Sequence, residues 1–114
     1  MKISTTEETN STATIALNGR LDIAGADVVA TPLAALSGSK SGLVIDMSGV
    51  TFMSSIGIRQ LVSAAKTMTR RGGRLVLLKP NDVVTEVLQT TGITDLLPIA
   101  RSESEAAAMV ASAS

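Results

Sequence analysis

A strand–helix–strand pattern in the middle of the chain limits the fold more than any other feature. Residues 43–47 and 75–78 are mostly apolar, without the alternation expected of a strand that has one face in water. Between them, the apolar positions of residues 55–71 recur at helical spacing, and Gly72 and Gly73 provide a stop signal. Two such strands joined by a helix predict a βαβ unit with parallel strands and a right-handed crossover. The fold class is therefore α/β.

The rest of the chain supplies the other elements of an α/β domain. Alternating residues predict a half-buried strand, and polar residues with cap or stop signals mark the ends of the helices. We expect one domain over residues 1–114, with a mixed sheet of about five strands and about four helices packed on it. The further predictions are strands over residues 2–6, 12–17 and 97–100, and helices over residues 24–37, from Asn81-Asp82 to Gly92-Ile93, and from a Ser102/Glu105 capping box to about Ala111.

The helix over residues 24–37 contains a proline, which leaves two interpretations. A proline inside a helix costs about 3 kcal/mol and kinks it. Alternatively, Thr31 caps a shorter helix in which Pro32 is the first residue, and residues 22–30 are then irregular. We favour one kinked helix over residues 24–37.

The composition excludes several classes of function. The chain has no cysteine and no histidine, which removes disulfides, thiolate chemistry, the commonest general base and the commonest metal ligand. Phe52 is the only aromatic residue and the formal net charge is zero, which argues against a nucleic-acid partner. No apolar run is long enough to span a bilayer and no signal peptide is recognisable. We expect a cytoplasmic protein with no direct membrane insertion, no cofactor and no metal site.

Two serines stand at the start of the helix over residues 55–71. Ser54 and Ser55 lie where backbone N–H groups are unpaired and the helix dipole is positive, so a phosphate on either hydroxyl is in a favourable field. The alternative is an N-cap, and replacing Ser55 with Ala would then cost about 1 kcal/mol of stability. The two roles are compatible, because a capping serine can also be modified.

An enzyme is the least supported class of function. Ser55, Ile56 and Gly57 form half of a Gly-x-Ser-x-Gly nucleophile motif, but Met53 replaces its first glycine. Without histidine no serine–histidine–acid triad can form. We therefore expect no catalytic residues.

Several short motifs follow one another in a fixed order. They are Gly-Arg-Leu-Asp at residues 19–22, Val-Ile-Asp-Met-Ser-Gly-Val at 44–50 and Phe-Met-Ser-Ser-Ile-Gly-Ile at 52–58. Gly72-Gly73, and a late Thr91-Gly92-Ile93 followed by Leu96-Leu97, fit the same order. Together they resemble the STAS family, the anti-sigma-factor antagonists of bacterial partner-switching pathways, along nearly the whole chain.

The resemblance implies a phosphorylation switch. An antagonist of this kind binds a serine kinase that is also the anti-sigma factor, is released when the kinase phosphorylates it, and is reset by a serine phosphatase. The acceptor lies two residues before the glycine at the helix start, which is Ser55 here. Ser54 stands where aspartate is frequent and Ile56 replaces a second serine, so Ser54 is an alternative acceptor. The resemblance places the partner-binding surface at Asp22, Ser54, Ile56, Gly57 and Ile58.

Other roles for these residues stay open. Asp22 is as well suited to capping the first helix, and Gly57 to a close contact inside the domain. Asp46 is expected to accept backbone N–H bonds in the loop before the serines. The basic residues Lys66, Arg70, Arg71 and Arg74 are expected to form a solvated face that complements the helix end. The alternative function is a non-phosphorylated STAS scaffold, or an accessory subunit of a signalling assembly or of a membrane transporter.

Overall fold

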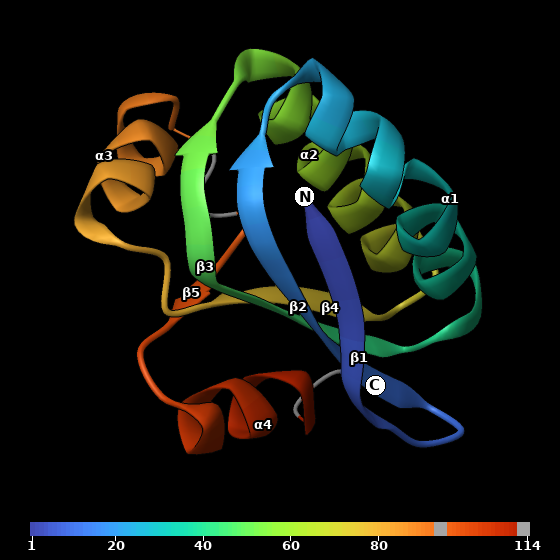
Figure 1. Ribbon diagram of the computed structural model, residues 1–114. Coiled ribbons are helices and arrows are strands. Elements are labelled where there is room, and N and C mark those ends of the chain that lie inside the picture. The colour runs from blue at the N-terminus through green and yellow to red at the C-terminus, as the bar shows by residue number, and fades with distance from the viewer. Residues whose placement is uncertain (93–95, 112–114) are drawn as a thin grey trace.

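A mixed sheet covered by helices on both faces organises the domain (Figure 1). The computed structural model describes residues 1–92 and 96–111. The strand order is β1-β2-β3-β4-β5, with β1 antiparallel to β2 and the other neighbours parallel. The α/β prediction of five strands and four helices is confirmed. The strands are β1 (Lys2–Glu8), β2 (Thr12–Leu21), β3 (Gly42–Met53), β4 (Arg74–Leu78) and β5 (Ile99–Ala100), and the helices are α1 (Ile23–Ser39), α2 (Ser55–Arg70), α3 (Asp82–Thr90) and α4 (Glu103–Ala111).

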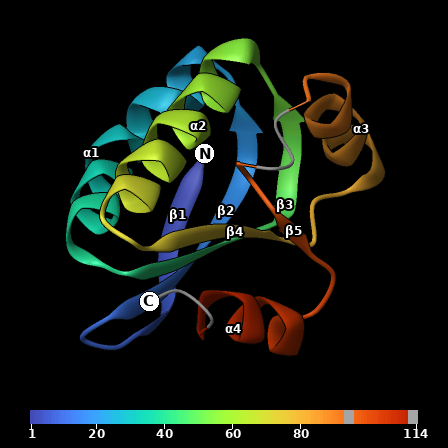
Figure 2. The ribbon, with the colours of Figure 1, turned by 180° about the vertical axis from the view of Figure 1, so that it is seen from behind.

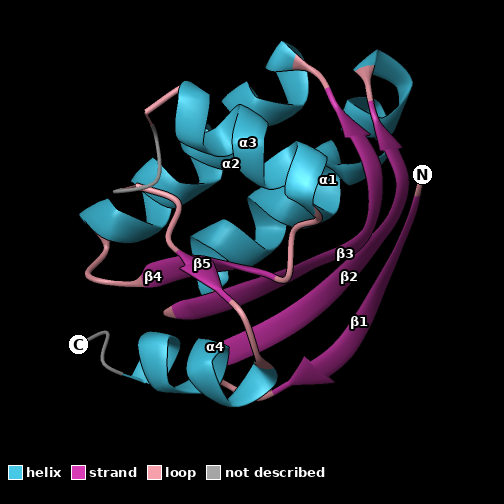
Figure 3. Cartoon of the chain, turned by 90° about the vertical axis from the view of Figure 1, so that its left-hand side faces the viewer, coloured by secondary structure: helices cyan, strands magenta, loops and turns pink. Residues whose placement is uncertain are grey.

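The two faces of the sheet are covered unequally. Helices α1, α2 and α3 lie on one face and α4 on the other (Figure 3). Alternate residues of β4 pack on opposite faces of the sheet. Leu75 and Leu77 belong to the large core, and Val76 and Leu78 belong to a smaller cluster beneath α4. All four side chains are buried. Burial on both faces explains why this strand is apolar without alternation.

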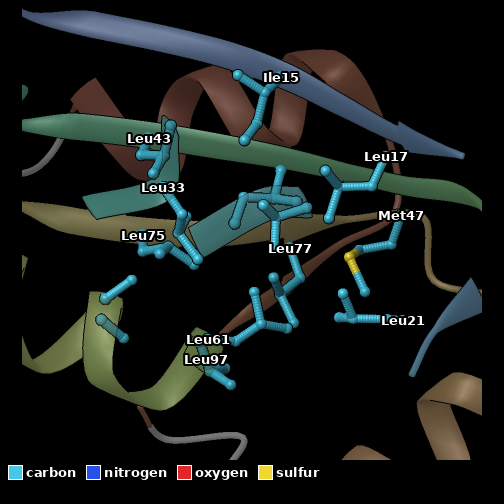
Figure 4. Packing of buried hydrophobic residues seen from close by; sticks show 14 of the residues in the cluster. Ile15, Leu17, Leu21, Leu33, Leu43, Met47, Leu61, Leu75, Leu77 and Leu97 are labelled. Atoms are coloured by element: carbon cyan, nitrogen blue, oxygen red, sulfur yellow. The ribbon is translucent and has the colours of Figure 1, made fainter. Parts of the chain in front are cut away.

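The large core lies between the sheet and helices α1 and α2. Ile15, Leu43 and Leu77 project from neighbouring strands toward Leu33 of α1 and Leu61 of α2 (Figure 4). Each of these side chains is at most 4% exposed. This packing fixes both helices on the sheet, and with them the residues at which the helices begin.

Strands β2 and β3 extend beyond the rest of the sheet, which corrects two predictions. The strand predicted over residues 12–17 continues to Leu21 as β2, so the segment at 19–21 is strand and not a turn. Strand β3 continues past Asp46 to Met53 instead of entering a loop. Pairing of β3 with β4 stops at Asp46, whereas pairing with β2 continues to Met53. The extension is a two-stranded ribbon that Val50 and Met53 anchor in the core.

Helix α1 is continuous through its proline, so the single-helix interpretation is confirmed and the short helix starting at Pro32 is wrong. The ring removes the N–H that residue 32 would donate inside the helix. Buried Val29 and Leu33, on either side of the proline, hold the helix against the core. Packing therefore compensates for the lost hydrogen bond.

The last two helices begin at the expected caps. Asn81 accepts a hydrogen bond from Val84 N–H at 2.8 Å and donates to Val50 O at 3.0 Å, which ties α3 to the β2–β3 ribbon. The capping box of α4 is half formed. Ser102 accepts from Glu105 N–H at 3.1 Å, but the Glu105 carboxylate accepts from Arg101 N–H at 3.4 Å instead of from the cap residue.

The region after α3 differs slightly from the prediction. Gly92 follows α3 with a φ of 72°, which suits the expected stop signal. Ile93, the other residue of that signal, lies outside the described residues. The strand predicted over residues 97–100 is shorter, covering Ile99–Ala100.

Candidate interaction site at the start of α2

The ribbon brings the first turns of α1 and α2 side by side (Figure 1). Strand β2 leads through Asp22 into α1, and β3 leads through Ser54 into α2. Ser54 N–H donates to Leu21 O at 3.0 Å, so the two junctions are joined directly. The Asp22 junction and the Ser54 junction, far apart in sequence, therefore form one end of the molecule.

The two serines have different roles. The Ser54 hydroxyl accepts from Gly57 N–H at 3.3 Å and donates to Leu21 O at 2.9 Å, so Ser54 is the N-cap of α2. Ser55 is the first helical residue and is exposed, and its hydroxyl has no hydrogen-bond partner among the described residues. The expectation that replacing Ser55 removes a cap is therefore wrong, because the cap is the preceding serine.

Asp22 is the N-cap of α1. Its carboxylate accepts from Gly25 N–H at 2.9 Å and from Arg20 Nε at 3.5 Å. The Gly25 N–H is the main cause that lowers the pKa of Asp22, with a smaller contribution from Arg20. Since the folded state favours the carboxylate, this contribution to stability is present above the ordinary pKa and is lost as the pH falls through the lowered one. The side chain is still 39% exposed, so the cap also faces solvent beside the serines.

Gly57 has an internal packing role. A Cβ atom at this position would lie 2.6 Å from Leu21 Cγ and 2.9 Å from Leu21 O. Both distances are shorter than real Cβ contacts allow, and Leu21 O also accepts the two hydrogen bonds from Ser54. Glycine is thus required for α2 to approach the end of β2.

Three large apolar side chains at this end are exposed to solvent. Ile23 begins α1, Phe52 lies near the end of β3, and Ile56 is in the first turn of α2, with exposed fractions of 69%, 39% and 38%. The Arg20 guanidinium lies 4.3 Å from the centre of the Phe52 ring. We call Ile23, Phe52, Ser55 and Ile56 the apical surface. Exposed apolar residues gathered at one end of a domain commonly mark an interaction site.

Sequence patterns reveal only part of this surface. Ile56 was predicted to bind a partner, whereas Ile23 and Phe52 were not recognised. Ile23 is not among the buried residues of α1. The sequence signal for it is an apolar residue directly after the N-cap, outside the helix's buried stripe. Ile58, also a predicted contact, is half-buried and packs against the core.

The other candidate residues lie away from the apical surface. Asp46 accepts from Ser48 N–H at 3.0 Å and from its hydroxyl at 2.7 Å, as expected, but inside β3 and not in a loop. At the far end of α2, Arg71 donates to Ser37 O at 2.8 Å and Lys40 O at 2.9 Å. Arg71 therefore satisfies the last carbonyls of α1 instead of contributing to a free basic face.

The described residues offer neither a metal-binding cluster nor a membrane-spanning helix. Within residues 1–92 and 96–111, His, Cys, Asp and Glu side chains form no group of three or more that could hold a metal ion. No helix in the same ranges has the length and apolar character needed to cross a bilayer.

Comparison with known proteins identifies the family. The fold and the serine-bearing helix start define a small α/β domain with a surface suited to binding. The family model of the STAS domain matches residues 4–106. BtrV of Bordetella bronchiseptica, assigned as an anti-sigma factor antagonist, is 31% identical over 93 residues, which are 81% of this chain and 80% of BtrV. The chain belongs to the STAS domain family, which confirms the resemblance seen in its motifs.

Solved structures share the fold. The anti-sigma factor antagonist SpoIIAA in its unphosphorylated form has a TM-score of 0.81, with 23% identity over 96% of each chain. Phosphorylated SpoIIAA of Bacillus has a TM-score of 0.73 and 22% identity, covering 96% of this chain and 99% of SpoIIAA. The murine anion transporter Slc26a9 has a TM-score of 0.75 and 19% identity, covering 92% of this chain and 18% of the transporter. At these identities the likeness shows the fold alone.

Replacing Gly57 with Ala tests the close contact between α2 and β2. We expect Gly57→Ala to lower the free energy of unfolding by about 1–3 kcal/mol, because the added methyl group must displace Leu21. Gly38→Ala is the matched control, since a Cβ at that helical position meets nothing within 4 Å. The control should gain up to about 1 kcal/mol. Urea unfolding of both variants measures the difference, and equal stabilities would contradict the packing role.

The assignment of Ser54 as the cap gives a second prediction. Ser54→Ala should lose about 1 kcal/mol of unfolding free energy, because Gly57 N–H loses its acceptor. Ser55→Ala should change stability by less than about 0.5 kcal/mol, as expected of an exposed side chain without partners. Thermal unfolding at neutral pH measures both. A larger loss in Ser55→Ala than in Ser54→Ala would show that the cap is assigned to the wrong serine.

Proposed function

We propose that this protein is an anti-sigma-factor antagonist that binds a serine kinase acting as the anti-sigma factor and is released by phosphorylation of Ser55. The observation that carries the proposal is the exposed Ser55 hydroxyl, which lies at a helix start within the apolar apical surface. The sequence similarity to BtrV and the fold likeness to SpoIIAA, both designated anti-sigma factor antagonists, support the same role.

Electrostatics explains how one phosphate would act as a switch. Phosphorylation adds about −1.5 to −2 charge units at neutral pH. The positive end of the α2 dipole tolerates this charge within the domain. A partner surface that covers Ile23, Phe52 and Ile56 must be largely apolar, and burying the phosphate against it is strongly unfavourable. Each 1.4 kcal/mol of this penalty weakens binding about tenfold.

The hydrogen bonds at the helix start favour Ser55 over Ser54 as the acceptor. A kinase must reach a free hydroxyl, and the Ser54 hydroxyl is occupied by Leu21 O and Gly57 N–H. Phosphorylation of Ser54 would replace the hydroxyl hydrogen and so break the bond that ties α2 to Leu21 O. Ser55 can be modified with the cap intact.

The rest of the proposed cycle follows from this chemistry. A serine phosphatase would restore the unmodified protein. By binding the anti-sigma factor, this cytoplasmic protein would release the sigma factor and so regulate transcription. The domain itself would act by binding and not by catalysis. The kinase, and not this domain, would bind the ATP and Mg²⁺ that phosphorylation needs.

A second candidate function is a STAS module that is not phosphorylated, in a signalling assembly or beside a membrane transporter. The fold likeness to a segment of Slc26a9 favours this candidate. So does the sequence at the helix start, where Ser54 and Ile56 replace residues of the antagonist motif. The two functions differ in whether Ser55 ever carries a phosphate.

Phosphosite mapping distinguishes the two functions. The kinase is recovered from native cells by pull-down with the unmodified protein and is then supplied with ATP and Mg²⁺. We expect one phosphate, on Ser55, in both wild type and Ser54→Ala, and none in Ser55→Ala. Phosphate on Ser54 would contradict the site, and stable capture of a transporter with Ser55 unmodified would favour the second function.

The apical surface can be tested separately from the phosphate. Ile56→Ala should weaken kinase binding by roughly 1–2 kcal/mol, or about tenfold, because it removes an apolar contact of the proposed interface. Val28→Ala is the control, since Val28 is 46% exposed on α1 but outside the apical surface. Isothermal titration measures both affinities. Equal losses in the two variants would place the interface elsewhere.

A further inference from the structure

A groove between α1 and α2 has the features of a small-molecule site. The two helices run side by side along one face of the sheet (Figure 2). The groove has a volume of about 440 Å³, within the range of about 300–1,000 Å³ that is usual for ligand sites. It is hollow because small residues line it, among them Ala30 and Ala34 of α1 and Ala64 of α2.

The side-chain oxygen of Gln60, a residue that lines this groove, has no hydrogen-bond donor among the described residues. Gln60 Nε2 donates to Ala26 O at 2.8 Å, which fixes the orientation of the amide, because the reverse orientation would place two acceptors in contact. Gln60 Oε1 is buried and accepts no hydrogen bond within the described part of the chain. A buried acceptor without a donor is unfavourable, and a ligand that supplies an N–H or O–H group would remove that cost.

The groove also carries an unpaired positive charge. Arg59, one residue before Gln60, is exposed and forms no ion pair or hydrogen bond with the other described residues. Leu33 and Ala64 provide apolar walls close to this charge. The walls, the acceptor and the cation together define the chemistry of the ligand.

We propose that the α1–α2 groove binds a small organic acid with a ring-sized apolar body and an N–H or O–H donor. The acid group pairs with Arg59, the apolar body lies on the alanine-lined floor, and the donor bonds to Gln60 Oε1. Gln60 is half-buried and lines the groove, so a small shift of its side chain opens Oε1 to the ligand while Nε2 keeps its bond to Ala26 O. The groove ends at Ile56, so its occupancy would alter the edge of the apical surface, but binding itself does not depend on the proposed function.

Anilinonaphthalene sulfonate is a suitable probe, because it combines an apolar body, an anion and an N–H donor. Its fluorescence gives the affinity, and amide NMR shifts locate it. We expect shifts along α1 and α2, including the side-chain amide signal of Gln60. Ala34→Leu should weaken binding by about tenfold, since it fills the groove. Arg59→Gln should weaken it roughly two- to fivefold.

A neighbouring position provides the control. Ala35 is exposed on the same helix and does not line the groove, so Ala35→Leu should leave the affinity unchanged. Both leucine variants are surface changes that keep the helix intact. Equal affinities in Ala34→Leu and Ala35→Leu, or shifts confined to other elements, would overturn the proposal.

Discussion

The parallel pairing of β2 and β3 beyond the edge of the sheet is the constraint on which the site depends. It brings Leu21 beside Met53, so that the backbone of Leu21 accepts both the N–H and the hydroxyl of Ser54. These bonds fix where α2 starts, and Gly57 lets the helix approach Leu21 without a clash. The residue at which α2 begins is therefore determined by a strand that lies more than thirty residues earlier in the sequence.

This arrangement separates the capping serine from the exposed one. Ser54 is committed to the cap, while Ser55 projects from the first helical position with its hydroxyl free among the described residues. The capping carboxylate of Asp22 and the apolar side chains Ile23 and Phe52 lie at the same end. A phosphate on Ser55 would thus add charge to the surface that a partner would bury. It would disturb the fold little, because Ser55 is not the cap.

Local patterns predicted the βαβ unit and the caps of α3 and α4, because each depends on a few adjacent residues. The strand extensions could not be predicted in the same way. Gly19 and Gly49 are typical of turns, and only pairing between β2 and β3 makes them strand residues. Which serine caps α2 depends on a shift of one residue, which sequence patterns do not resolve. The exposure of Ile23 and Phe52 depends on how the ribbon meets both helices, so it too required the structure.

The most direct test of the central claim is the affinity of the partner kinase for the protein carrying phosphoserine at position 55, measured by titration beside the unmodified protein. If the apical surface is the interface, the phosphate should weaken binding at least about a hundredfold, which corresponds to about 2.7 kcal/mol. Equal affinities for the two forms would contradict the claim that Ser55 controls partner binding.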